Sequence, residues 1–109
     1  PVLDILDSNG LQVYKYWEDR PLPVKSSNPD LPSIVYSVPG KEAVVVVTSY
    51  SKKDENVELT VDAKTLGFTG AWTAVNAETG EKIAANSGRL TFPLKTHDAR
   101  VLRLTAAQN

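Results

Sequence analysis

The stretch that decides the fold is Glu42-Ala43-Val44-Val45-Val46-Val47-Thr48-Ser49. Four consecutive valines favour a β-strand, because β-branched side chains pack well on a pleated surface. A run without polar alternation is typical of a strand that is buried on both faces. We therefore predict that Val44–Val47 forms the central strand, inside a sandwich and away from any open sheet edge.

The segments on both sides of the valine run indicate further strands. Ser33–Val38 precedes it and is separated from it by the turn-forming pair Pro39-Gly40, so these two segments predict a hairpin. Beyond the run, Val57–Val61 alternates apolar and polar residues, which indicates a half-buried strand with one solvent-facing side. We predict that Val57–Val61 also pairs with the valine strand.

The N-terminal third is less regular. Pro1–Gly10 is consistent with a strand or a short helical turn before a tight Asn-Gly turn. Leu11–Asp19 has the alternation and the aromatic content of a strand. Arg20–Pro32 contains four prolines and predicts a loop, with an edge strand near Val24, because proline lacks a ladder donor.

The C-terminal half continues the all-β pattern. We expect Lys64–Gly70 to be a loop that turns Leu66 and Phe68 inward, and Thr105–Asn109 to be a frayed polar tail. The strands expected between them are Ala71–Ala77, Glu81–Ala85, Arg89–Leu94 and Ala99–Leu104. About eight strands at this spacing predict an antiparallel two-sheet β-sandwich with Greek-key-like connections.

Length and composition narrow the possible functions. The 109 residues fit one domain, with 1–12 as a linker or first strand and 13–105 as the sandwich. A net charge of -1 with scattered basic residues gives no footprint for nucleic acid or an anionic membrane, and no apolar run approaches a membrane span. A chain that begins at Pro1 and has no methionine is expected to be a piece of a longer protein.

The acidic residues are densest at Asp54, Glu55, Glu58 and Asp62. Glycosidase chemistry uses two carboxyl groups about 5–9.5 Å apart. On one face of an extended strand, Glu58 and Asp62 are separated by roughly 13 Å, at about 3.3 Å per residue. A solvated strand face is therefore the better interpretation, and no catalytic residue is predicted.

His97, between Thr96 and Asp98, is the only histidine. A general base or a metal ligand at this position would need partners that converge in space, and adjacency in the sequence does not supply them. The chain also has no cysteine and no Asp-x-Asp-x-Asp-Gly calcium loop. We interpret this segment as a turn and predict no metal site and no cofactor.

Aromatic residues are the strongest candidates for binding, because flat rings stack on the apolar faces of sugars. Tyr14 and Tyr16 share one face of their strand, and Trp17 lies on the opposite face with Val13. Trp72 lies in the strand expected over Ala71–Ala77, pointing opposite to Thr73 and Val75, and the sequence does not decide which face of the sheet it occupies. We predict that Tyr14, Tyr16, Trp17 and Trp72 bind carbohydrate or form a domain interface, with core or interface packing favoured for both tryptophans.

Three segments together resemble a known family: Glu42–Asp62, Ala71–Ile83 with its Asn-Ala-Glu-Thr-Gly-Glu hairpin, and Leu90–Leu104 with its Pro-Leu and Asp-Ala-Arg-Val-Leu pattern. They are similar to the C-terminal β-sandwich domains that follow the (β/α)-barrel of amylase-like and α-galactosidase-like glycoside hydrolases. The similarity covers roughly residues 13–105. In that family the catalytic carboxylates lie in the barrel, and no position here matches them.

This resemblance implies a non-catalytic accessory domain that stabilises or packs on an upstream catalytic barrel of the same chain. It predicts an apolar patch at Val13–Trp17, where that barrel packs. The alternatives are a carbohydrate-binding module and an immunoglobulin-like or fibronectin-like spacer domain. A bacterial glycosidase of this kind would be secreted or periplasmic, and the sequence itself gives no compartment.

Overall fold

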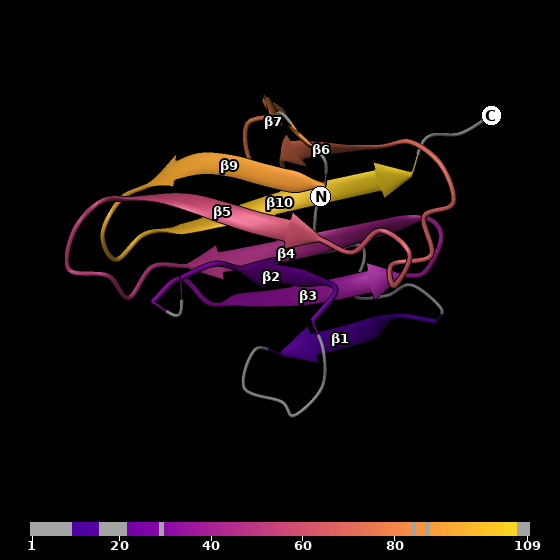
Figure 1. The fold of residues 1–109 in the computed structure, drawn as a ribbon, viewed down its shortest axis with the longest axis horizontal. Helices are drawn as coiled ribbons and strands as arrows, with labels where there is room; N and C mark the ends of the chain where they lie inside the picture. Colours follow the sequence, from indigo (N-terminus) through magenta and orange to yellow (C-terminus); the bar gives the residue numbers. More distant parts are fainter. Residues whose placement is uncertain (1–9, 16–21, 29, 84, 87, 107–109) are drawn as a thin grey trace.

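The computed structural model describes residues 10–15, 22–28, 30–83, 85–86 and 88–106. In this part of the chain two antiparallel sheets face each other (Figure 1). One has the strand order β1 (Gln12–Lys15), β3 (Ser33–Val38), β4 (Glu42–Thr48), β10 (Ala99–Ala106), β6 (Trp72–Asn76) and β7 (Lys82–Ile83). The other has the order β2 (Val24–Ser26), β5 (Glu55–Val61), β9 (Arg89–Leu94) and β8 (Ala85–Asn86). The predicted all-β, two-sheet sandwich is confirmed.

Strand β4, which carries the valine run, lies in the interior of the six-stranded sheet between β3 and β10. Val45 is the register partner of Val35 on β3 and of Leu102 on β10. The predicted hairpin with Ser33–Val38 is confirmed. The predicted pairing with Val57–Val61 is wrong, because the chain crosses to the other sheet after β4. That crossing is fixed where Tyr50 N–H donates to the carbonyl oxygen of Asp30 at 2.8 Å.

The two faces of β4 are buried to different extents. Ala43, Val45 and Val47 are fully buried between the sheets, whereas on the opposite side Val44 is buried and Val46 is half-buried. Burying one valine side chain contributes about 1.5–3 kcal/mol. The core between the sheets also contains Leu31, Val57, Leu59, Leu66, Phe68, Leu90, Phe92, Leu94, Leu102 and Leu104. The valine run therefore supports one core and a second, smaller apolar layer.

The loop after β5 packs against the β3–β4 turn. Leu66 and Phe68 are buried, as predicted. Between them Gly67 has φ +79° and lies against the backbone of Gly40, whose N–H donates to the carbonyl oxygen of Leu66 at 2.9 Å. This contact joins a loop of one sheet to a turn of the other.

Two details at the edges refine the sequence expectations. The predicted edge strand near Val24 is present as β2, which pairs with β5 alone. The predicted frayed tail begins too early, because Thr105 and Ala106 continue β10 and pair with Thr73 and Trp72. Backbone hydrogen bonds to β6 order a segment that its own polarity did not mark as a strand.

Candidate domain interface

The outer faces of the two sheets differ in polarity. Register partners in neighbouring strands project to the same side of a sheet, so the pairing assigns each residue to a face. The outer face of the four-stranded sheet, the polar outer face below, is formed by Lys25, Asn56, Glu58, Thr60, Arg89, Thr91 and Pro93. The apolar outer face lies on the six-stranded sheet and comprises Leu11, Val13, Ile34, Tyr36, Val38, Val44, Val46, Val75 and Val101.

The centre of the apolar outer face is packed as a small cluster. Val38 and Val44 are 8% and 4% exposed, and Leu11, Tyr36 and Val101 pack against them. Polar side chains on this side of the sheet lie mainly toward the strand ends or on the edge strands: Lys15, Glu42, Thr48, Thr73, Lys82 and Thr105. An apolar patch with a polar rim is the usual composition of a surface that meets another protein or domain.

One charged residue lies within the apolar patch. Arg103 is the register partner of Val44 on β4 and of Val75 on β6. Its NH2 nitrogen lies 3.4 Å from Oε1 of Glu42, and both side chains are about one-third exposed. The Arg103 Nε atom is buried and has no hydrogen-bond partner among the described residues.

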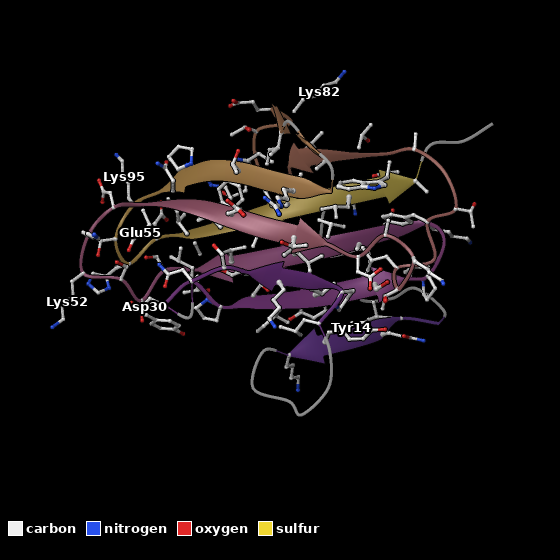
Figure 2. All side chains as sticks on the ribbon, viewed as in Figure 1. Tyr14, Asp30, Lys52, Glu55, Lys82 and Lys95 are labelled. Atoms are coloured by element: carbon white, nitrogen blue, oxygen red, sulfur yellow. The ribbon has the colours of Figure 1, made fainter. Side chains whose placement is uncertain are left out.

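The predicted aromatic site residues do not form a common exposed platform in the described part of the chain. Tyr14 is half-buried, packs against the main core and donates its hydroxyl hydrogen to Gln12 Oε1 at 2.8 Å (Figure 2). Trp72 packs against the same core, with its ring centroid 6.5 Å from that of Phe68. Tyr16 and Trp17 lie outside the described residues, so their roles, and the predicted patch that includes them, stay predictions.

A pocket of about 620 Å³ at one end of the sandwich is lined by Asp54, Glu55, Asn56, Pro93, Leu94, Lys95, Asp98 and Arg100. Glu55 and Lys95 project at this end in Figure 2. Its carboxylates already bind neighbouring turns: Asp54 Oδ1 accepts from Thr96 N–H at 3.0 Å and Glu55 Oε2 from Ser51 Oγ at 2.8 Å. Asp54 thereby connects the β4–β5 loop to the β9–β10 loop, whereas Glu55 holds a turn within the β4–β5 segment.

The other two acidic residues also have local partners. Glu58 lies on the polar outer face, 3.9 Å from Arg89. Asp62 follows the end of β5 and accepts from the Thr65 hydroxyl at 2.7 Å and from Thr65 N–H at 3.2 Å. These hydrogen bonds, that of the hydroxyl above all, lower the pKa of the Asp62 carboxyl. The structure thus separates Glu58 and Asp62 into a strand face and a turn.

His97 occupies the β9–β10 turn, as interpreted from the sequence, with φ 58° in the left-handed region. The turn is closed by Asp98 N–H, which donates to the carbonyl oxygen of Lys95 at 3.1 Å. Among the described residues no three His, Asp or Glu side chains are grouped so that they could bind a metal ion. In the same residues no helix is long and apolar enough to cross a membrane.

Sequence reasoning expected an apolar patch at Val13–Trp17, and Val13 does lie on the apolar outer face. The larger part of this face, on β3, β4 and β10, was missed. A signal was available, because Ile34, Tyr36 and Val38 fill one alternating set of positions in Ser33–Val38, while the other set also contains the apolar Val35. A strand with that pattern in an antiparallel sandwich must cover something on its outer side. The sequence did not indicate that β3, β4 and β10 are neighbours in one sheet.

Fold and surface together define a β-sandwich module with one polar and one apolar outer face. The model of the glycoside hydrolase 123 C-terminal domain matches residues 2–101, and the chain belongs to this family. The resemblance to C-terminal domains of glycoside hydrolases is thereby confirmed. No curated protein sequence matches the chain.

Solved structures with a similar fold are parts of much larger proteins. A GH27 β-L-arabinopyranosidase from Geobacillus stearothermophilus, in complex with arabinose, has a TM-score of 0.59 and 18% identity over 78% of this chain and 20% of that one. AmyP in complex with maltotriose has a TM-score of 0.58 and 16% identity, over 78% of this chain and 17% of AmyP. An α-amylase from Anoxybacillus has a TM-score of 0.54 and 12% identity, over 79% of this chain and 18% of the amylase. The chain spans about one-fifth of their length.

Proposed function

We propose that this chain is a non-catalytic accessory domain of a glycoside hydrolase, and that its apolar outer face packs on a catalytic domain that precedes it in the same polypeptide. The observation that carries the proposal is the difference in polarity between the two outer faces. A sandwich that met only water on both sides would gain nothing from a valine-rich outer face.

Two further observations support the catalytic domain as the occupant. The family is that of a C-terminal domain, and the similar structures are about five times longer than the stretch that resembles this chain. In addition, Leu11, which leads into the edge strand β1, packs on the apolar outer face. The first described residues before β1 therefore lie on the side of the apolar outer face.

A non-catalytic role agrees with the acidic residues. The carboxylates of Glu55 and Asp62 accept hydrogen bonds from residues close in sequence, and Asp54 accepts from Thr96 in the β9–β10 loop. Glu58 pairs with Arg89 on a strand face. A glycosidase needs one carboxyl to give up a proton and another to act as nucleophile or base, both aimed at one bond. In the described residues these side chains bind structural partners instead.

The test uses the full-length enzyme and a truncated form that ends before this domain. We expect the isolated domain to hydrolyse no glycoside and the truncated enzyme to unfold at a lower temperature than the complete one. Hydrolysis by the isolated domain would refute the non-catalytic assignment. Equal thermal stability of both enzyme forms would refute the stabilising role.

A pair of substitutions tests the face itself. Val46→Lys places a charge on the apolar outer face, where it would be desolvated on packing, and is expected to lower the unfolding midpoint of the complete enzyme by several degrees. Thr60→Lys makes the same change on the polar outer face and is expected to have little effect. Equal effects of the two variants would contradict the assignment of the face.

A further inference from the structure

We propose that Arg103 is the polar anchor of this interface, meaning the residue whose guanidinium donates hydrogen bonds to carbonyl oxygens of the catalytic domain. The proposal rests on the proposed function and names the chemistry of the partner surface. It starts from the place of Arg103 in the middle of the apolar outer face, where its side chain pairs with Glu42 and stays about one-third exposed. Its Nε atom is buried without an acceptor among the described residues, so only the NH1 and NH2 groups can meet a partner domain.

The position of Arg103 suits an interface. The residue stands in a cross-strand row with Tyr36, Val44 and Val75, near the middle of the six-stranded sheet. Its side chain is still 32% exposed, so part of it is open to solvent on the apolar outer face. When another domain covers the patch, the water that serves the remaining N–H groups is displaced, and the partner must supply acceptors.

Glu42 determines which acceptors fit. Its carboxylate lies 3.4 Å from the Arg103 NH2 nitrogen and balances the charge of the guanidinium. A second carboxylate from the partner would leave a net negative charge in a desolvated interface, which is unfavourable. Neutral carbonyl oxygens of the backbone or of Asn and Gln side chains satisfy the donors without adding charge.

Another ion pair, on the opposite side of the sandwich, provides a comparison for Arg103 and Glu42. Arg89 and Glu58 lie on the polar outer face at 3.9 Å, and their side chains are 64% and 45% exposed. Most of the Arg89 side chain is therefore open to water. The two arginines can therefore be compared by substitution, because each pairs with a glutamate and they lie on opposite outer faces of the sandwich.

The experiment compares Arg103→Met, Arg103→Lys and Arg89→Met in the full-length enzyme. Methionine keeps the apolar stem and removes every donor, whereas lysine keeps the charge near Glu42 but lacks the fork and the Nε–H group. We expect Arg103→Met to lower the unfolding midpoint by about 2–4 °C and to speed proteolysis between the domains. Arg103→Lys should restore only a minor part of the lost unfolding midpoint. The unfolding midpoint of Arg89→Met should equal that of the wild type.

The failures of the two proposals are distinguishable. If truncation and Val46→Lys destabilise the enzyme while Arg103→Met does not, the face packs on the catalytic domain and Arg103 is not its anchor. Full recovery by Arg103→Lys would also overturn the proposal, because charge alone would then be sufficient. If neither Val46→Lys nor Arg103→Met has an effect, both proposals are wrong.

Discussion

Gly67 and Gly40 meet backbone to backbone: a Cβ atom on Gly67 would lie 2.7 Å from the amide nitrogen of Gly40. Gly67 also has φ +79°, a conformation that side chains disfavour. We predict that Gly67→Ala destabilises the domain more than Gly80→Ala. Gly80 has nearly the same φ, +77°, but open space around its Cα.

For Gly80→Ala we expect a loss of about 1–2 kcal/mol from the left-handed backbone alone. Gly67→Ala should cost at least about 1 kcal/mol more, because backbone atoms must move apart. Urea unfolding of the two variants measures the difference. Equal losses would show that the close approach in the structure carries no strain.

Adjacent residues on β10 test the two-layer description of the six-stranded sheet. Leu102 is fully buried between the sheets, whereas Val101 is half-buried on the apolar outer face. We predict that Leu102→Ala lowers the free energy of unfolding of the domain by about 2–5 kcal/mol, and that Val101→Ala costs less than half as much. If Val101→Ala lowered the free energy of unfolding more than Leu102→Ala, the main core would have to lie on the Val101 side of β10, which would contradict the structure.

The hydrogen bonds from Thr65 to Asp62 give a pH-dependent contribution to stability. Because they lower the folded-state pKa of Asp62, their contribution is fully present above its unfolded pKa and is lost as the pH falls through the lowered value. We predict that Thr65→Val raises the Asp62 pKa in an NMR titration. It should also flatten the acid limb of the stability curve below about pH 4. An unchanged pKa would contradict this assignment.

The packing of Trp72 predicts a result for carbohydrate titration. Its ring is partly buried and packs against Phe68 and the main core, which reduces the ring surface available for stacking on a sugar. In a Trp17→Phe variant, Trp72 is the only tryptophan. We expect its fluorescence to stay constant when soluble oligosaccharides are added at millimolar concentration. A saturable change would favour the carbohydrate-binding module instead.

The strands themselves were predictable from the sequence because local patterns determine them. The valine run, the Pro39-Gly40 turn and the alternation of Leu90, Phe92 and Leu94 each carry their own signal, and the structure confirms them. The sheet to which a strand belongs depends on where loops cross over. The alternating pattern of Val57–Val61 fits a strand next to β4 in one sheet as well as a strand in the facing sheet. Its pairing partner therefore could not be deduced from its own residues.

The candidate site was harder to predict, because it is a property of several strands together. Tyr36, Val44 and Val101 come from three strands and form one surface only through the register of β3, β4 and β10. Arg103 is an ordinary surface cation in the sequence. Its unpartnered Nε appears only when its neighbours Val44 and Val75 are placed beside it.

The most direct test of the docked face is hydroxyl-radical footprinting of two tyrosines in the isolated domain and in the full-length enzyme. Tyr36 lies on the apolar outer face, whereas Tyr50, in the loop after β4, is 60% exposed and serves as the control. We predict that Tyr36 is modified several-fold more slowly in the full-length enzyme, while the rate at Tyr50 is unchanged. Equal modification of Tyr36 in both forms would contradict the account.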